Sequence, residues 1–314
     1  MQFDKQQGLA KQARELHAEW TRTFGWSGGL QPAEQSGGLK PAAPVTHSIA
    51  EEVKKLTDAR AQELAQQLAG GAITTEEHND QRFVMVMAMR RLIDSGSEEY
   101  AARILSRQMH DLYADNPPLP NPKYRFSYDW VTTHTGDWER DLGHLKGKPD
   151  VRALEIGCFE GQSACWFLDN ILTHPTSRLT CVDPFAVSMA SILLRYFEAR
   201  FDENIAASGA SDRVTKLIGP SQVVVRMLQP VQFDFIYVDG SHKVGDVLVD
   251  AVLAWTVLRP GGIVMFDDYA LVDDAAPEGI MARAPGRALD AFVGILGQSA
   301  ELVRRDWQLV LKKM

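Results

Sequence analysis

The sequence has no unbroken apolar run of the about 18 residues that a membrane-spanning helix needs. Its first seven residues, MQFDKQQ, lack the apolar centre of a secretory signal peptide. Lysine and arginine never form a run longer than a pair, and the net charge is −8. Phosphate neutralisation needs a clustered basic face, so this balance weighs against a nucleic-acid partner. We therefore expect a cytoplasmic protein without a membrane or nucleic-acid partner.

Cysteine is also scarce. The chain has three, Cys158, Cys165 and Cys181, and no two of them form a Cys-x-x-Cys pair. All three lie in or beside apolar strand and helix patterns, which favours buried, reduced thiols over a metal site or a disulfide.

What the sequence does contain is ordinary globular composition, with 45% hydrophobic and 24% charged residues in 314. Its first part, residues 1–150, is predicted to be helical. Helices are expected at residues 5–24, 48–68, 75–92 and 97–113. Ser48 and Glu51 match a capping box at the start of the second helix.

A Gly- and Pro-rich linker at residues 25–47 separates the first helix from the rest. We expect residues 1–150 to act as a cap and oligomerisation region. The linker would allow the first helix to pack on a second subunit, giving a homodimer.

An aromatic segment at residues 124–138 closes this part. Aromatic side chains with polar tips suit the wall of a binding pocket. The alternative is a connector that packs the helical region onto the following domain. His134 in this segment is either a hydrogen-bonded structural histidine or part of a site.

The second part, residues 151–314, alternates apolar strands with amphipathic helices, which predicts an α/β fold with a doubly wound, mostly parallel sheet. The expected strands are residues 151–156, 178–182, 213–218, 233–238, 263–266, 301–304 and 307–312. Residues 259–262 are expected to form the turn before the fifth of these.

Ligands of an open parallel sheet bind beyond the carboxyl ends of its strands. Gly157 and Gly161 follow the first strand, and their spacing differs from the Gly-x-Gly-x-x-Gly of dinucleotide binders. This difference counts against a nucleotide-binding oxidoreductase. Asp183 ends the second strand, where an acid can accept the hydroxyls of a ribose. Its alternative role is that of a turn residue ahead of Pro184.

These motifs together resemble the class I S-adenosylmethionine-dependent methyltransferases. The best-matched segments are residues 154–163 (LEIGCFEGQS), 180–185 (TCVDPF), 233–242 (FDFIYVDGSH) and 258–269 (LRPGGIVMFDDY). The last two are similar to the bacterial O-methyltransferases of macrolide sugars and other natural products. They are more distantly similar to catechol and caffeoyl-CoA O-methyltransferases.

The resemblance implies a Rossmann-like, seven-stranded sheet whose last strand is antiparallel, and S-adenosylmethionine as cofactor. Glu155, Gly157 and Gly161 would hold the methionine end of that cofactor, and Asp183 its ribose. Gly219 and Ser221 would lie near the adenine. The other residues that we assign to the cofactor are Cys158, Phe159, Ser163, Pro184, Asp239 and Gly240.

Paired acids point to a metal. Asp239 ends one strand and Asp267 and Asp268 end the next, and neighbouring strands lie about 4.8 Å apart. Their carboxylates can therefore converge on a hard divalent cation such as Mg²⁺. Such an ion would lower the pKa of a substrate hydroxyl and orient it. The alternative is that Asp239 touches only the cofactor, while Asp267 and Asp268 cap the following loop.

His242 follows Asp239 by three residues, where the catechol-type enzymes carry a catalytic lysine. An imidazole beside an activated hydroxyl suits a general base near neutral pH. His242 could instead cap the next helix or line the pocket, and Lys243 is a weaker candidate for the base. We assign catalysis to His242 and Asp239.

The sequence thus predicts a metal-assisted O-methyltransferase that acts on a small hydroxylated molecule, such as a natural product. Two alternatives are a metal-independent methyltransferase acting on nitrogen or a carboxyl group, and a non-catalytic nucleotide-binding module.

Overall fold

A computed structural model describes residues 2–24, 44–94, 97–114, 116–119, 121–185, 191–272 and 279–314. Most of the predicted linker therefore falls outside the described residues. The chain forms two compact units. The first comprises Met1–Pro120 with Ser188–Tyr196, and the second comprises Asn121–Val187 with Phe197–Met314. The boundary thus lies about thirty residues earlier than the predicted one at 150.

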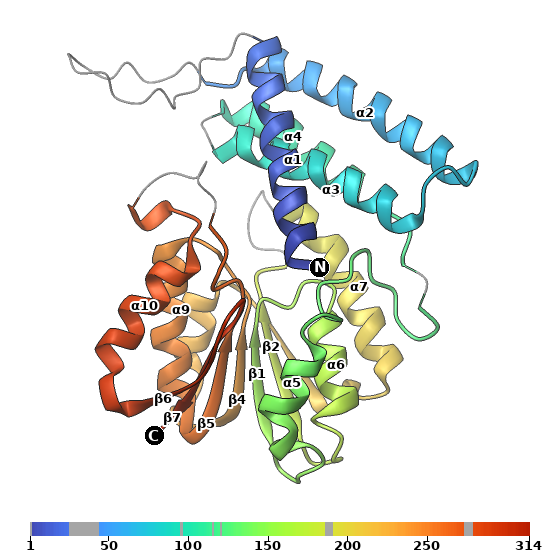
Figure 1. Cartoon of the computed structure of the whole chain (residues 1–314). Helices are drawn as coiled ribbons and strands as arrows, with labels where there is room; N and C mark the ends of the chain where they lie inside the picture. The colour runs from blue at the N-terminus through green and yellow to red at the C-terminus, as the bar shows by residue number, and fades with distance from the viewer. Residues whose placement is uncertain are drawn as a thin grey trace, which may run out of the picture. The chain divides into compact units, whose positions relative to one another are not determined.

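The first unit is helical, as predicted (Figure 1). Its helices are α1 (Gln2–Thr23), α2 (His47–Ala69), α3 (Thr75–Asp94) and α4 (Glu99–Ala114). Leu9 and Ala13 of α1 pack against Val84 of α3 in a small buried cluster. The first helix therefore packs within its own chain here, and its exchange between subunits stays a prediction.

The starts of α2 and α3 show how well capping signals in the sequence predict where a helix begins. The capping box predicted at Ser48 is wrong, because α2 already begins at His47 and its N-cap, Thr46, makes no side-chain capping bond. A reciprocal capping box instead precedes α3. There the Glu77 amide donates to Thr74 Oγ1 at 3.1 Å, and the Thr74 amide donates to Glu77 Oε2 at 2.8 Å.

The second unit is built on a seven-stranded sheet with the order β3-β2-β1-β4-β5-β7-β6. Its strands are β1 (Arg152–Ile156), β2 (Arg178–Asp183), β3 (Val214–Ile218), β4 (Phe233–Val238), β5 (Leu258–Phe266), β6 (Ala300–Arg305) and β7 (Leu309–Lys313). The first five run parallel, and β7 is antiparallel to both β5 and β6. This topology confirms the predicted Rossmann-like fold with an antiparallel last strand.

The predicted turn at residues 259–262 is part of β5. Leu258 pairs with Phe233, whereas Ile263 pairs with Phe235, so the intervening residues form a bulge in the strand.

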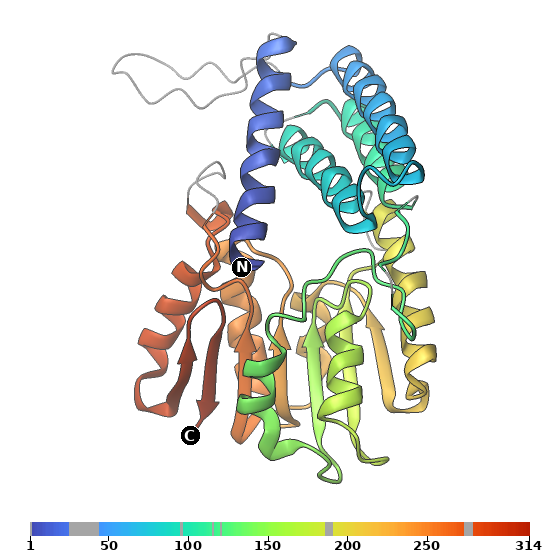
Figure 2. The ribbon, with the colours of Figure 1, turned by 45° about the vertical axis from the view of Figure 1, so that its right-hand side comes forward.

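Helices cover both faces of this sheet (Figures 1 and 2). They are α5 (Thr135–Leu142), α6 (Gln162–Asn170), α7 (Ser191–Ser208), α8 (Ser221–Val224), α9 (Val244–Val257) and α10 (Pro285–Leu296). The single 3₁₀ turns are Gly143–Leu145, Ser211–Arg213, Val225–Met227, Gly279–Met281 and Gly297–Ser299. Residues of α5, α6 and α7 share one core with Phe235 and Tyr237, and residues of α8, α9 and α10 share the other with Ile236 and Val238. This alternation along β4 follows from the two-residue period of a strand.

The aromatic segment explains why the second unit begins at Asn121. Trp138 is fully buried, its indole N–H donates to Gln308 Oε1 at 2.9 Å, and its ring lies 5.2 Å from that of Tyr237. Tyr124 and Phe126 are buried in the same core. The segment therefore packs onto the sheet of the second unit, and both its role as a pocket wall and its role as a connector stay predictions.

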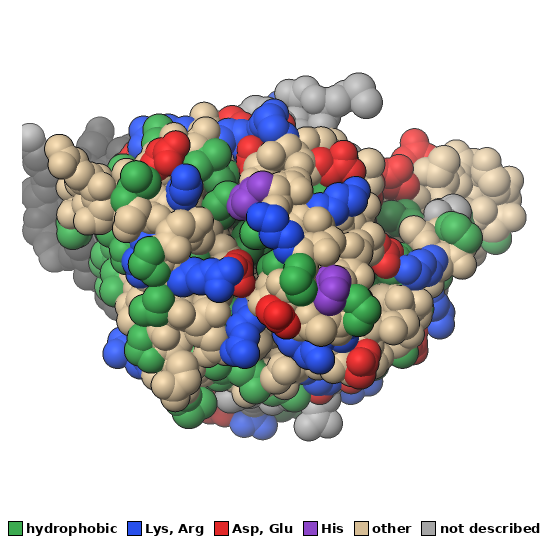
Figure 3. Space-filling model, turned by 90° about the horizontal axis from the view of Figure 1, so that it is seen from below, with side chains coloured by type: hydrophobic (Ala, Val, Ile, Leu, Met, Phe, Trp, Pro, Cys, Tyr) green, Lys and Arg blue, Asp and Glu red, His purple; other side chains and the backbone are tan. Residues whose placement is uncertain are grey.

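Other expectations concern the surface and the thiols. All three cysteines are buried and free, as expected. Among the described residues, no helix is both long and apolar enough to cross a membrane. On the face shown in Figure 3, lysine and arginine side chains are scattered among acidic and uncharged ones.

Candidate active site at the strand tips

The carboxyl ends of β1 and β4 meet at Gly157. This residue has φ +85°, and a Cβ built on it would lie 1.9 Å from the Asp239 carbonyl oxygen. The Asp239 amide in turn donates to the Ile156 carbonyl at 2.8 Å. Only a glycine permits this approach, so the loop after β1 and the acidic tip of β4 form one surface.

The same loop ends at Gly161, which precedes α6 with φ +82°. A Cβ there would lie 2.9 Å from the ring of Phe201. Between the two glycines, Phe159 has φ +47°, and its ring centroid lies 4.0 Å from that of Phe197. The loop is therefore held in one conformation by contacts on both sides.

Asp183 anchors this loop from the tip of β2. Its Oδ2 accepts from the amides of Cys158 at 2.8 Å and Phe159 at 3.2 Å, and its Oδ1 accepts from the Phe185 amide at 3.0 Å. Burial raises the pKa of Asp183, and the hydrogen bonds from the three amides reduce this increase but do not cancel it. The carboxylate thus serves as a turn residue. Since a carboxylate offers about four lone-pair sites, one remains for the ribose contact, which stays a prediction.

Glu155 lies beneath the loop. Its side chain is fully buried, it accepts a short hydrogen bond from Ser163 Oγ, and the Cys181 thiol lies 3.9 Å from Oε2. Burial raises its pKa to about 8. The structure therefore joins Glu155 and Ser163, two of the predicted cofactor residues, in one buried pair.

We expect Glu155 to make the stability of the chain depend on pH. Its folded pKa lies above its ordinary value of 4.5, so its contribution to stability is complete below pH 4.5 and is lost as the pH rises through about 8. We expect the free energy of unfolding to fall over this interval in the native chain and to fall less in Glu155→Gln, in urea titrations at several pH values. Equal slopes for the two proteins would show that another group titrates.

The residues predicted near the adenine are also engaged. The Gly219 amide donates to the Asp183 carbonyl at 3.0 Å, and Ser221 Oγ donates to Asp250 Oδ1 at 2.6 Å. A Cβ on Gly240 would lie 3.4 Å from Asp250 Oδ2. Asp250 is buried, and burial raises its pKa to about 6. Sequence reasoning missed Asp250, although it is an acid within an otherwise apolar helical stretch. Pro184 lies exposed directly after Asp183.

An acidic group lies at the tips of β4 and β5. His242 Nε2 lies 2.9 Å from Asp268 Oδ2 and 3.8 Å from Asp239 Oδ1. Asp267 is not part of this group, because its carboxylate accepts a short hydrogen bond from the Tyr237 hydroxyl and another from the Asp268 amide at 2.7 Å. The structure therefore brings together Asp239, His242 and Asp268, where the sequence predicted Asp239, Asp267 and Asp268 as ligands.

Arg283 completes this group, and sequence reasoning missed it. Its Nη2 lies 3.0 Å from His242 Nδ1. A guanidinium only donates hydrogen bonds, so Nδ1 must accept here and the proton of a neutral imidazole sits on Nε2, facing Asp268. No motif marks Arg283, which follows His242 by 41 residues.

The charges around His242 act in opposite directions. Burial lowers its pKa, but the carboxylates of Asp268 and Asp239 outweigh this effect and raise the pKa to about 10. A charged imidazole would carry a proton on Nδ1 as well, opposite the donor of Arg283. Protonation of His242 and the Arg283 contact therefore exclude each other. Burial also raises the pKa of Asp239, to about 7. In Asp268 burial again acts to raise the pKa, but the charge of His242 and its hydrogen bond outweigh burial and lower the pKa.

The donor atoms of Asp239, His242 and Asp268 all lie within 4.8 Å of one another, which fits a divalent cation. Carboxylate oxygens suit Mg²⁺, and an imidazole extends the choice to transition metals. His242 can ligate through Nε2 only if Nδ1 carries the proton, which requires Arg283 to move. The two carboxylates need no such change.

Residues 154–269 match the family model described as a methyltransferase domain. These residues form a methyltransferase domain. The strand order of the sheet is the one expected for the class I fold. The matched segment contains the whole candidate site except Arg283.

Curated relatives match part of this chain. The uncharacterized protein R132 of Acanthamoeba polyphaga mimivirus is 26% identical over 131 residues, which are 41% of this chain and 56% of that protein. The O-methyltransferase hkm8 of Aspergillus hancockii is 27% identical over 117 residues, which are 37% of this chain and 42% of that protein. The aligned part thus spans about half the length of these relatives.

Solved structures are similar to the methyltransferase domain. The O-methyltransferase TomG of Streptomyces achromogenes, which is involved in tomaymycin synthesis and was solved with S-adenosylmethionine, aligns at a TM-score of 0.46 and 18% identity, over 69% of this chain and 91% of TomG. An O-methyltransferase of Bacillus cereus with S-adenosylhomocysteine aligns at 0.44 and 18%, over 59% and 83%. These scores are low, so the fold assignment rests on the strand order.

Proposed function

We propose that this chain is an S-adenosylmethionine-dependent O-methyltransferase acting on a hydroxyl of a small molecule. The observation that carries the proposal is the contact between Gly157 and Asp239. It sets the predicted cofactor loop directly against the group of Asp239, His242 and Asp268. A methyl donor held by the loop would therefore lie beside side chains that can orient and deprotonate an acceptor.

The reaction needs alignment and a proton acceptor. The methyl group leaves the sulfonium sulfur for the acceptor oxygen, and the hydroxyl proton passes to the protein. Asp239 suits this role, because its pKa of about 7 makes it a stronger base than an ordinary carboxylate. His242, whose Nδ1 faces Arg283, donates to Asp268 and holds that carboxylate in place. His242 becomes a base in its own right only when Arg283 withdraws.

Divalent metal assistance is the second part of the proposal. Asp239 and Asp268 would hold the ion, and the bound ion would lower the pKa of the acceptor hydroxyl. Activity should then be lost on thorough chelation and return with added Mg²⁺ or Mn²⁺. Unchanged turnover after chelation would show a metal-independent enzyme, in which Asp239 acts as the base alone.

The cofactor can be tested without knowing the acceptor. We expect S-adenosylmethionine and S-adenosylhomocysteine to raise the melting temperature of the full chain, with NAD as the control that does not. At a hundred times the dissociation constant the ligand should add about 2.7 kcal/mol of stability. Stabilisation by NAD alone would contradict the proposed methyltransferase activity and would favour a nucleotide-binding module.

The chemical class of the methyl acceptor can be identified with a panel of candidate compounds. We expect at least one compound among phenols, catechols, sugars and hydroxylated acids to be methylated, and a radiolabelled cofactor would detect the product. Amines and carboxylic acids without hydroxyls belong in the same panel. Product from these alone would favour the N- or carboxyl-methyltransferase alternative.

A further inference from the structure

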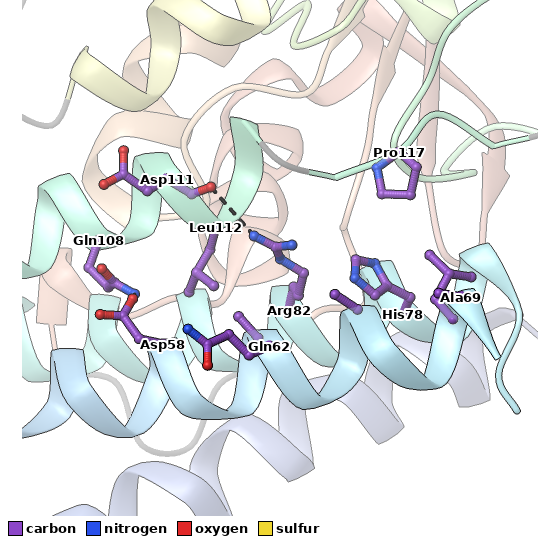
Figure 4. Close-up of a pocket in the computed structure, with 12 residues that line it drawn as sticks. Asp58, Gln62, Ala69, His78, Arg82, Gln108, Asp111, Leu112 and Pro117 are labelled. Atoms are coloured by element: carbon purple, nitrogen blue, oxygen red, sulfur yellow. Dashed lines mark hydrogen bonds between the residues drawn. The ribbon is translucent and has the colours of Figure 1, made fainter.

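The helical unit contains a pocket of its own. It has a volume of about 580 Å³ and lies among α2, α3 and α4, as Figure 4 shows. Small-molecule pockets measure about 300–1,000 Å³. One wall is an apolar stripe of α2 that includes Ala61, Ala65 and Leu68. Opposite this stripe lie polar side chains of α3 and α4, and two of those on α3 define what the pocket can recognise.

Gln108 on α4 is part of the pocket wall. The residue is 2% exposed, and its Nε2 donates to Thr57 Oγ1 at 3.0 Å and to Asp58 Oδ1 at 2.7 Å. Since a carboxylate only accepts, these bonds fix which end of the amide faces Asp58. The remaining atom, Oε1, is buried in the pocket wall and has no hydrogen-bond partner within the described part of the chain. This oxygen keeps almost no accessible surface, so a ligand in the pocket does not reach it in this conformation.

His78 on α3 offers an acceptor. Asn79 Nδ2 donates to the Pro117 carbonyl at 2.8 Å, so Asn79 Oδ1 faces His78 Nδ1 at 3.0 Å and the proton sits on Nδ1. Burial lowers the pKa of His78, and Arg82 lowers it further, so the imidazole is neutral. Its Nε2 therefore carries a lone pair.

Arg82 supplies the donor. It lies one turn after His78 on the same face of α3 and is 5% exposed. Its Nη2 donates to the Asp111 carbonyl over 3.5 Å, the contact drawn in Figure 4. The guanidinium is not part of a cationic patch, because the carboxylates of Asp58 and Asp111 also line the pocket. This balance disfavours phosphates and other polyanions.

We propose that the helical unit binds, in this pocket, a neutral small molecule with an apolar body and hydroxyl groups. A ligand hydroxyl donates to His78 Nε2, a ligand oxygen accepts from Arg82, and the apolar body covers the α2 stripe. None of the residues that line this pocket belongs to the strand tips, and the proposal does not depend on the proposed methyl transfer.

Resorcinol is a suitable probe, because it has two hydroxyls on an apolar ring, and 1,3-dimethoxybenzene is its counterpart without donors. Titration of the full chain, followed by saturation-transfer NMR, should show saturable binding of resorcinol and at least about tenfold weaker binding of the dimethyl ether. Excess S-adenosylhomocysteine should not displace resorcinol. Displacement, or equal binding of both probes, would overturn the proposal.

Two tryptophan variants locate the site. Ala65 is exposed and lines the pocket, so Ala65→Trp should fill it and abolish binding without disturbing the core. Gln66 is exposed beside it but is not a lining residue, so Gln66→Trp is the matched control and should bind as the native chain does. Retained binding in Ala65→Trp would place resorcinol elsewhere. Equal or tighter binding of benzoate or inorganic phosphate would show an anion site instead.

Discussion

Replacing Gly157 with alanine is expected to destabilise the chain by about 3 kcal/mol or more and to abolish binding of S-adenosylhomocysteine. The added Cβ would lie 1.9 Å from the Asp239 carbonyl oxygen, 2.5 Å from its carbon and 2.8 Å from Gly240 Cα. All three atoms belong to the backbone, so no side chain can turn aside. The loop after β1 and the tip of β4 would have to separate, which removes the surface on which the proposed site depends.

Gly209 supplies the control. It has φ +78°, close to that of Gly157, but a Cβ on it would meet nothing within 4 Å. Gly209→Ala therefore carries the same backbone strain without the clash and should cost about 1 kcal/mol. Urea unfolding measures both losses, and titration with S-adenosylhomocysteine measures binding. If the two variants lose equal stability, the contact between Gly157 and Asp239 does not constrain the fold.

The sheet could be predicted because its strands carry their own signal. β4 is buried along its whole length, and its predicted bounds, 233–238, agree with the structure. Central parallel strands are covered on both faces, so they appear as short apolar runs that end where polar residues begin. Strand β5 was predicted less well, because the Pro260-Gly261 sequence is a turn signal that pairing with β4 overrides.

The unit boundary could not be predicted from such runs. Residues 124–138 have no strand or helix period that ties them to either unit. Their place is set by tertiary contacts, above all by Trp138, whose partners Tyr237 and Gln308 lie far along the chain. The pocket of the helical unit escaped prediction for the same reason, since Gln108 meets Thr57 and Asp58 across about fifty residues of sequence.

The sequence predicted which strand tips carry the site, but it did not predict which of the two adjacent aspartates belongs to it. Asp267 and Asp268 are adjacent and directly follow β5, which ends at Phe266. Asp267 continues the row of Met265, on the face of the sheet that also holds Tyr237, and bonds to the Tyr237 hydroxyl. Asp268 leaves the strand with φ +55° and meets His242. The turn after β5, and not the strand period, therefore separates the two carboxylates.

The different positions of the Asp267 and Asp268 carboxylates give the strongest test of the proposed chemistry. Asp268→Asn is expected to lower kcat/KM for methyl transfer by about a hundredfold, because the proposed metal would lose one of its two carboxylates. The change removes the charge that holds the His242 N–H and, in the proposal, one carboxylate of the metal site. Asparagine tolerates a positive φ, so the backbone at residue 268 should be kept.

Asp267→Asn is the matched variant, with the same chemical change one residue away. Its oxygen can still accept from Tyr237, so kcat/KM should fall by less than about tenfold, the loss expected for about one hydrogen bond. Titration with S-adenosylhomocysteine should give similar affinities for both variants and the native chain, which shows that the cofactor loop is intact. A larger loss in Asp267→Asn than in Asp268→Asn would contradict the assignment to Asp239, His242 and Asp268. It would favour the set that the sequence predicted, with Asp267 turned from Tyr237 towards the reacting atoms.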